Sequence, residues 1–382
     1  MQVTRLDIRN LRRFDEVSLA PSPGLNVITG ENGAGKTSVL EALHLIAYGR
    51  SFRGRVRDGV IKAGAPAVEV FVEWRDGACS SVRSGTDRDI SVKAGTRVHK
   101  AGLRHSGDGW EGRLDGAAVS HLGELCAASA VVTFEPGSHA LITGGADNRR
   151  RYLDWGLFHV ERDFLALWRR YLRALKQRNA LLKTRRPDAQ LGAWEHELAE
   201  AGEPLGRLRQ GYLEALQPYF TAALTEMTPQ LADTRLEYHP GWRRDEYPLA
   251  DALLLARDRD LAAGFTSVGP HRADWRLVFS ALPGREALSR GQAKLAALAA
   301  ILGQASHHAS TTGEWPVIAL DDLGSELDRR HQRRVLEKLA GTPVQVFLTG
   351  TEPPPSLGEA GVQAGARFHV ERGQVVRLEG AP

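Results

Sequence analysis

A glycine-rich stretch at residues 30–37, Gly-Glu-Asn-Gly-Ala-Gly-Lys-Thr, is the feature that most constrains how this 382-residue chain can fold. It follows the apolar residues 25–29, which predict a buried strand, and it precedes apolar residues at helical spacing between 37 and 48. A phosphate-binding loop needs this arrangement, because glycines let backbone N–H groups surround a phosphate and the helix N-terminus adds positive charge. The sequence therefore predicts an α/β nucleotide-binding fold rather than a chance glycine-rich turn.

The residues of this loop have separate expected roles in binding ATP and Mg²⁺. Lys36 is expected to reach the β- and γ-phosphates and to act in catalysis, and the hydroxyl of Thr37 is expected to bind Mg²⁺. The expected nucleotide contacts in this part of the chain are Gly30, Glu31, Asn32, Gly33, Ala34, Gly35, Lys36, Thr37 and Ser38.

A second apolar stretch, at residues 317–320, ends in two adjacent carboxylates, Asp321 and Asp322. Two acids this close are costly to place at the end of a buried strand unless a cation is near. We expect Asp321 to bind Mg²⁺ and Asp322 to act as a catalytic residue that polarises the attacking water. A helix cap at a strand-to-loop junction is the alternative, and the phosphate loop in the same chain argues against it.

The residues Leu288-Ser289-Arg290-Gly291-Gln292 resemble the signature of ABC ATPases, usually Leu-Ser-Gly-Gly-Gln, with Arg290 in place of the first glycine. A serine helix cap would explain this segment by itself. The order of phosphate loop, signature, carboxylates and a D-loop-like segment at 325–328 favours the ABC interpretation. The resemblance implies that Ser289, Gly291 and Gln292 contact nucleotide held by a second copy, so that ATP causes homodimerisation. It also implies slow hydrolysis, because ABC ATPases usually carry the longer glutamate where Asp322 stands.

The chain divides into three expected parts. Residues 1–135 join the phosphate loop to short alternating stretches that predict antiparallel strands, residues 136–264 show helical periodicity, and residues 265–382 hold the signature, the carboxylates and the D-loop-like segment. The predicted fold is an α/β ABC-type ATPase head with an antiparallel β subdomain and an inserted helical arm lobe.

A short heptad pattern between Leu191 and Tyr212 suits an antiparallel helical arm, and an ordinary helical lobe explains it equally well. Gly202 and Pro204 lie inside this pattern and predict a kink or a break there.

Positive charge is concentrated in the helical part. Residues 149–186 contain twelve Lys or Arg and only three Asp or Glu. Their local net charge is therefore +9, in a chain of net charge +4. A face that binds a polyanion has this character, although a solvated helical face is the more general explanation. The candidate DNA-binding residues are Arg149, Arg150, Arg151, Lys176, Arg178, Lys183, Arg185 and Arg186.

Composition excludes several classes of protein. The two cysteines, Cys79 and Cys126, provide neither a disulfide framework nor the spacing of a zinc site. No apolar run approaches the roughly 18 residues of a membrane span, and residues 1–6 lack the apolar core of a signal peptide. We therefore expect a cytoplasmic protein without a membrane partner.

Several segments resemble the RecF family of bacterial DNA replication and repair ATPases. They are, in chain order, residues 6–14, 30–37, 148–154, 175–183, 269–274 and 320–328, and they span almost the whole chain. Residues 50–130 carry the least specific similarity.

The resemblance implies an ATP-dependent DNA-binding protein that acts at single-strand gaps and stalled forks. Its implied partners are DNA, RecO and RecR, and through them RecA. It makes the basic stretch a candidate DNA face, and it implies that Arg12 and Arg13 reach the nucleotide or DNA. The alternative is an ABC-type ATPase subunit that drives a transporter or another machine, although the long basic helical insertion counts against that alternative.

Overall fold

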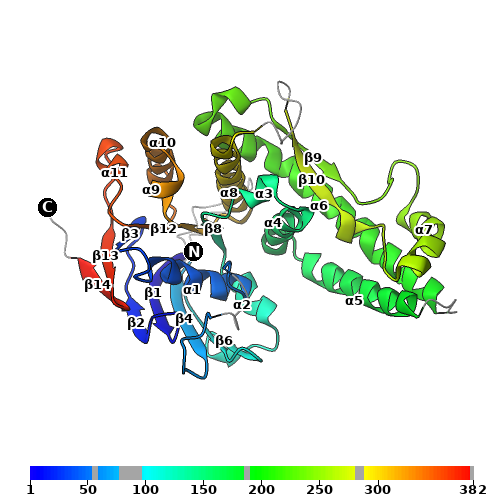
Figure 1. The fold of residues 1–382 in the computed structure, drawn as a ribbon, viewed down its shortest axis with the longest axis horizontal. Helices are drawn as coiled ribbons and strands as arrows, with labels where there is room; N and C mark the ends of the chain where they lie inside the picture. Colours follow the sequence, from blue (N-terminus) through cyan, green and yellow to red (C-terminus); the bar gives the residue numbers. More distant parts are fainter. Residues whose placement is uncertain (54–58, 77–96, 185–189, 280–287, 379–382) are drawn as a thin grey trace, which may run out of the picture. The chain divides into compact units, whose positions relative to one another are not determined.

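The computed structural model describes residues 1–53, 59–76, 97–184, 190–279 and 288–378, which fall into two compact units (Figure 1). The first unit comprises Met1–Ser138 and His308–Pro382, and the second comprises His139–His307. The phosphate loop and both carboxylates therefore belong to the first unit, whereas the signature segment belongs to the second.

The first unit contains a mostly parallel sheet with the strand order β14-β13-β3-β12-β11-β8. Its strands pair in parallel except for the antiparallel pair β13 and β14. Strands β3, β11 and β12 are buried along their whole length, as expected of strands that are covered on both faces. The bounds are β3 Leu25–Thr29, β8 Val131–Phe134, β11 Val317–Leu320, β12 Val346–Gly350, β13 Ala366–Glu371 and β14 Gln374–Leu378.

An antiparallel sheet, in the order β2-β1-β4-β5-β6-β7, forms the predicted β subdomain of the same unit. Alternation places Leu6, Ile8, Val70 and Val72 on its inner face, in one core with helix α1 (Lys36–Tyr48). The bounds are β1 Gln2–Arg9, β2 Glu16–Leu19, β4 Val68–Arg75, β5 Val98–His105, β6 Trp110–Leu114 and β7 Ala117–Ala118.

The remaining helices of the first unit are short or cover the parallel sheet. They are α2 Leu122–Ala128, α9 Leu323–Glu326, α10 Arg329–Ala340 and α11 Ser356–Glu359. Helix α10 has a side-chain cap, because the carboxylate of Asp328 accepts a hydrogen bond from the backbone N–H of His331 at 3.0 Å. The expected α/β ABC-type head with an antiparallel β subdomain is confirmed.

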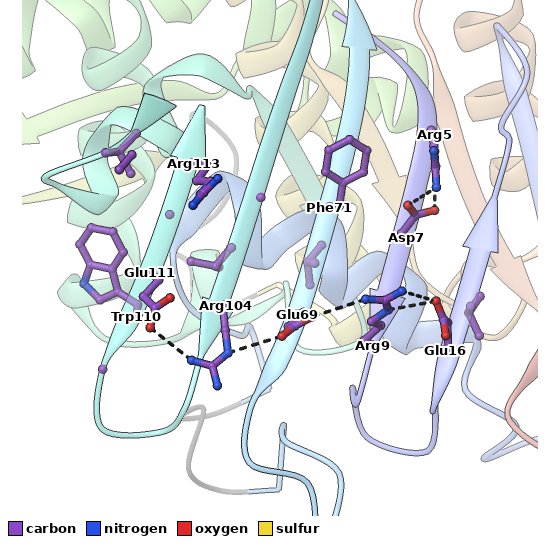
Figure 2. Close-up of a pocket in the computed structure, with 18 of the residues that line it drawn as sticks. Arg5, Asp7, Arg9, Glu16, Glu69, Phe71, Arg104, Trp110, Glu111 and Arg113 are labelled. Carbon is purple, nitrogen blue, oxygen red and sulfur yellow. Dashed lines mark hydrogen bonds and ion pairs between the residues drawn. The ribbon is translucent and has the colours of Figure 1, made fainter. Parts of the chain in front are cut away.

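A row of alternating charges crosses the outer face of the antiparallel sheet (Figure 2). Arg9 pairs with Glu16 at 2.6 Å and with Glu69 at 3.9 Å. Arg104 pairs with Glu69 at 3.4 Å and with Glu111 at 3.2 Å. These residues lie directly opposite one another on five neighbouring strands, so each charge has an opposite charge beside it.

The second unit is mainly helical, with one two-stranded antiparallel sheet of β9 and β10. It includes residues 265–307, which we expected in the C-terminal part of the head. They belong here because β10 pairs with β9 and because the Tyr152 hydroxyl donates to the Ala300 carbonyl of α8 at 2.6 Å. The bounds are α3 Ala140–Thr143, α4 Ala146–Val160, α5 Phe164–Lys183, α6 Leu191–Met227, β9 Arg235–His239, α7 Leu249–Ala263, β10 Asp274–Val278 and α8 Arg290–Thr312, whose residues from His308 onward belong to the first unit.

Helix α6 runs for 37 residues without a break, although Pro204 and Pro218 lie inside it. The break suggested as one outcome at Gly202 and Pro204 is therefore absent. A Cβ on Gly202 would lie 2.4 Å from Leu249 and 3.1 Å from Tyr171, so the missing side chain lets α5 and α7 pack closely. Tertiary packing of this kind outweighs the roughly 3 kcal/mol that a proline costs inside a helix.

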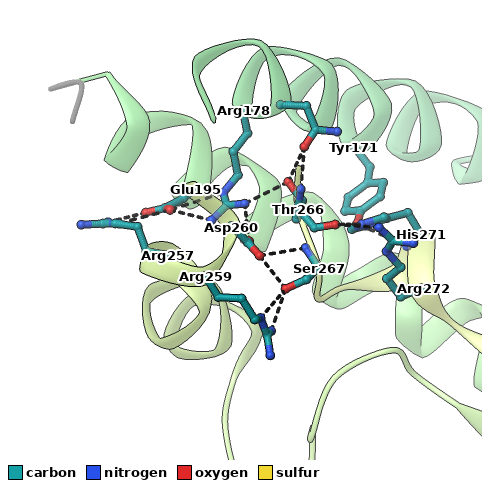
Figure 3. A network of polar contacts seen from close by, with 11 residues as sticks. Tyr171, Arg178, Glu195, Arg257, Arg259, Asp260, Thr266, Ser267, His271 and Arg272 are labelled. Atoms are coloured by element: carbon teal, nitrogen blue, oxygen red, sulfur yellow. Dashed lines mark hydrogen bonds and ion pairs between the residues drawn. The ribbon is translucent and has the colours of Figure 1, made fainter. Parts of the chain in front are cut away.

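A buried polar network joins α5, α6 and α7 (Figure 3). The side chain of Arg178 is fully buried and forms ion pairs with Glu195 at 2.9 Å and with Asp260 at 2.7 Å. It also donates to the Thr266 hydroxyl at 2.9 Å, and the Asn179 side chain accepts a hydrogen bond from the Thr266 backbone at 2.8 Å. The network therefore fixes the segment after α7 against two consecutive residues of α5.

Replacement of Arg178 by methionine should strongly destabilise the second unit, because two buried carboxylates would lose their cation. We expect a loss of about 3–5 kcal/mol in the free energy of unfolding, measured by urea denaturation. The matched control is Lys176→Met on the exposed side of the same helix, which should change stability by less than about 0.5 kcal/mol. Equal unfolding midpoints for the two variants would contradict a structural role for Arg178.

Candidate nucleotide site

The predicted phosphate loop lies between β3 and α1, at the carboxyl end of the parallel sheet. Gly30 has a φ of 149°, and a Cβ there would lie 2.2 Å from the carbonyl oxygen of Val370 on β13, so only glycine fits. Helix α1 begins after Gly35 without a side-chain cap. Its first backbone N–H groups are therefore available to an anion.

The ammonium of Lys36 lies inside the loop. It donates hydrogen bonds to the carbonyl oxygens of Gly30 at 2.8 Å and of Glu31 at 2.9 Å. Burial lowers the pKa of Lys36, and the charges of Asp322 and Asp321 oppose this effect. The lysine thus places a cation where the loop N–H groups converge.

Asp321 and Thr37 meet at the same place, although 284 positions separate them in the sequence. The Thr37 hydroxyl donates to Oδ1 of Asp321 at 2.9 Å. Burial raises the pKa of Asp321, and hydrogen bonds from Thr349 and Thr37 counteract this rise. A hydroxyl and a carboxylate are the hard oxygen donors that suit Mg²⁺, which takes few protein ligands when it also binds phosphate.

Asp322 has a left-handed backbone, with φ of 50° and ψ of 42°, which is uncommon for a residue other than glycine. Its Oδ2 accepts a hydrogen bond from the Ser325 hydroxyl at 2.6 Å. The side chain that we expect to polarise water is thus engaged by the D-loop-like segment.

Thr349, at the end of β12, is a site residue that the sequence analysis missed. Its hydroxyl donates to Oδ1 of Asp321 at 2.6 Å and accepts from the backbone N–H of Asp322 at 2.9 Å. The signal that identifies it is a hydroxyl residue at the carboxyl end of an apolar strand, because parallel strands end at one edge of the sheet.

The basic residues after β1 are divided between two tasks. Arg12 forms a bidentate pair with the buried Glu41 of α1, at 3.0 and 2.8 Å, and donates to the Gly59 carbonyl at 3.0 Å. The neighbouring Arg13 has its Nη1 atom 3.7 Å from the position that a Cβ would take on Gly33. Of the two arginines expected to reach nucleotide or DNA, Arg13 therefore lies beside the phosphate loop, whereas Arg12 is held by Glu41.

The signature segment begins α8 in the second unit. The Ser289 hydroxyl accepts a hydrogen bond from the backbone of Gln292 at 3.2 Å, and the Gln292 side chain accepts one from the backbone of Ser289 at 2.9 Å. This reciprocal pair caps the helix. Ser289 and Gly291 are exposed, so the start of α8 is open to another molecule.

The structure removes two arginines from the candidate DNA face. Arg149 is buried and pairs with Asp274 at 2.6 Å, and Arg178 is held in the network described above. The prediction that either contacts DNA is wrong, because both side chains are buried and their guanidinium groups already pair with carboxylates.

The other candidates differ in their exposure. Arg150 is largely covered and donates to the Ala273 carbonyl at 2.7 Å, whereas Arg151, Lys176 and Lys183 are exposed. Arg185 and Arg186 lie outside the described residues.

Among the helices that the structure describes, none has the length and hydropathy needed to cross a bilayer.

Comparison with known proteins agrees with this geometry. The family model for the RecF/RecN/SMC N terminal domain matches residues 2–354. The "DNA replication and repair protein RecF" of Stenotrophomonas maltophilia (strain R551-3) is 62% identical over 378 residues, which cover 99% of this chain and 100% of the relative. The protein of the same name from Thioalkalivibrio sulfidiphilus (strain HL-EbGR7) is 37% identical and covers 98% of each chain.

A solved structure described as "Structure of the recombination mediator protein RecF-ATP in RecFOR pathway" superposes with a TM-score of 0.84 at 26% identity, covering 99% of this chain and 98% of that one. A solved structure described as "Crystal structure of the SmcHead bound to the C-winged helix domain of ScpA" superposes with a TM-score of 0.58 at 15% identity and shares the fold. The resemblance drawn from the sequence segments is therefore confirmed: this chain belongs to the RecF family.

Proposed function

We propose that this chain is an ATP-dependent DNA-binding protein of recombinational repair and replication-fork maintenance. The main observation that supports this proposal is the cluster of Thr37, Asp321 and Thr349 beside the phosphate loop. The cluster provides the hydroxyl and carboxylate oxygens that a nucleotide-bound Mg²⁺ needs. The names of the relatives, which describe DNA replication and repair, support the DNA part of the proposal.

Each residue of the proposed site has a defined task. Lys36 and the free N–H groups of α1 bind the phosphates. Thr37 and Asp321 hold Mg²⁺, which would neutralise negative charge on the phosphates. Thr349 keeps the Asp321 carboxylate oriented toward Thr37. Asp322 orients the attacking water, and hydrolysis is slow because this short side chain is also hydrogen-bonded to Ser325.

The signature segment supplies the other half of the site from a second copy. Ser289 and Gly291 are exposed at the start of α8, where the unpaired backbone N–H groups of a helix favour an anion. ATP then binds between two copies and causes dimerisation. This arrangement also explains why the chain carries the phosphate loop and the signature in separate compact units.

Exposed lysines of α5 meet the DNA backbone in this proposal. Lys176 and Lys183 are exposed, so they can neutralise phosphates without reading base sequence. The protein acts at single-strand gaps in the cytoplasm with RecO and RecR, and through them helps to load RecA. The printed description of the solved relative, which places it in a RecFOR pathway, supports these partners. A transporter ATPase subunit is disfavoured, because the relatives are named for DNA repair.

Two variants should separate nucleotide binding from dimerisation. Lys36→Ala removes a charged hydrogen-bond donor, so ATP affinity should fall roughly 10- to 100-fold and the ATP-dependent dimer should disappear. Ser289→Ala should leave the ATP affinity of the single copy unchanged and still prevent dimerisation. Binding of a fluorescent ATP analogue measures the affinity, and sedimentation velocity with and without ATP and Mg²⁺ measures dimerisation. An ATP-dependent dimer of Ser289→Ala would contradict the shared site.

Thr349→Val should slow hydrolysis while ATP affinity stays close to that of the wild type. The variant keeps the shape of the side chain but loses the hydrogen bonds to Asp321 and Asp322, which should cost about tenfold or more in rate. Single-turnover phosphate release measures the rate. Thr349→Ser retains the hydroxyl and should restore most of the activity; equal rates for Thr349→Val and wild type would exclude the assigned role.

The double variant Lys176→Ala with Lys183→Ala should weaken DNA binding in a salt-dependent way. Loss of two phosphate contacts should reduce the slope of log affinity against log salt by about 2, measured by fluorescence anisotropy at several salt concentrations. Arg207→Ala, an exposed arginine on α6, is the matched control and should leave the slope unchanged. If the double variant kept the wild-type slope, α5 would not be the DNA face.

A further inference from the structure

The outer face of the antiparallel sheet contains a groove with a volume of ≈ 990 Å³, and its lining includes none of the expected nucleotide-site residues (Figure 2). Side chains from β1, β2, β4, β5 and β6 line it. The opposite face of the same strands is buried in the core, so this groove is open on the solvent side of the sheet.

A glycine creates a notch in the middle of the groove. Gly102 on β5 lies directly opposite Phe71 on β4 and Arg113 on β6. A Cβ on Gly102 would meet no atom within 4 Å, so the space above this residue is empty. The row of side chains across the sheet is therefore interrupted between an aromatic ring and a guanidinium group.

The charges around the notch are unevenly compensated. Arg5 pairs with Asp7 at 2.8 Å and lies over the Phe71 ring at 5.7 Å, and Arg9 and Arg104 belong to the charge row described above. Arg113 is exposed, and its guanidinium group forms neither a hydrogen bond nor an ion pair with any residue that the structure describes. One uncompensated cation thus stands across the notch from the aromatic ring of Phe71.

We propose that this groove binds a protein partner through a segment that carries an aromatic side chain next to a carboxylate. The aromatic ring would enter above Gly102 and pack against Phe71, where aromatic pairs add stabilisation beyond the area that they bury. The carboxylate would pair with Arg113. Aromatic and arginine side chains in partly enclosed pockets are the residues that dominate the energetics of protein interfaces.

The charges of the groove favour a protein over nucleic acid. Its lining includes five acidic side chains and four arginines, and three of these arginines are already ion-paired. A phosphate backbone that follows the groove would meet the carboxylates of Glu16, Glu69 and Glu111, which repel it. A protein segment with one carboxylate needs only Arg113. This inference goes beyond the proposed function, because the groove uses neither the nucleotide residues nor α5.

The test measures binding of a fluorescein-labelled peptide with one carboxylate, Gly-Ser-Phe-Asp-Ser-Gly with an amidated C-terminus, to the full-length chain by fluorescence anisotropy. The wild type should show saturable binding. Gly102→Val fills the notch and Arg113→Glu reverses its charge, and each should weaken binding about tenfold or more. The matched control is Arg75→Glu, an exposed arginine of β4 outside the groove, which should bind as the wild type does.

Absence of saturable binding by the wild type would overturn the proposal, as would equal binding by the groove variants. A labelled oligo(dT) whose affinity falls in Gly102→Val and Arg113→Glu would assign the groove to single-stranded DNA and would also overturn it. ATP-dependent dimerisation of all three variants should match that of the wild type. A variant that failed to dimerise would have a damaged nucleotide site, and its loss of peptide binding would not be counted for the groove.

Discussion

The Asp321 carboxylate is the point on which the nucleotide site depends. It is buried at the end of β11, and it accepts hydrogen bonds from the hydroxyls of Thr37 and Thr349. An ionised carboxylate in such a place is unfavourable unless donors or a cation surround it. The strand order β3-β12-β11 brings all three residues to one edge of the sheet. Sheet topology therefore creates the binding site, and the loop sequence supplies its phosphate contacts.

Strong local patterns explain why much of this unit could be predicted. The glycine loop between an apolar strand and a helix, and the two acids after another apolar strand, indicate both elements and chemistry without structural information. Thr349 and the distinction between Arg12 and Arg13 could not be inferred in the same way. The first depends on which strand lies beside β11, and the second depends on the pairing of Arg12 with Glu41.

The basic stretch illustrates a different limit. Charge counting treated twelve Lys and Arg residues alike, although Arg178 occupies the buried stripe of α5 with Tyr171, Ala174 and Leu182. Arg178 stands four residues from both Ala174 and Leu182, the spacing of one helix face, but charge counting alone made it a DNA-binding candidate. Its partners were not visible, because Glu195 and Asp260 follow at separations of 17 and 82 residues. Exposed and structural cations are thus interleaved on one helix.

The continuity of α6 has a mechanical consequence. At 1.5 Å per residue, its 37 residues extend about 55 Å as one rod. A rod of this length converts a rotation of about 10° at one end into a displacement of about 10 Å at the other. Because the Arg178 network and the close contact at Gly202 clamp α5 and α7 to it, all three helices would be carried along together by such a rotation.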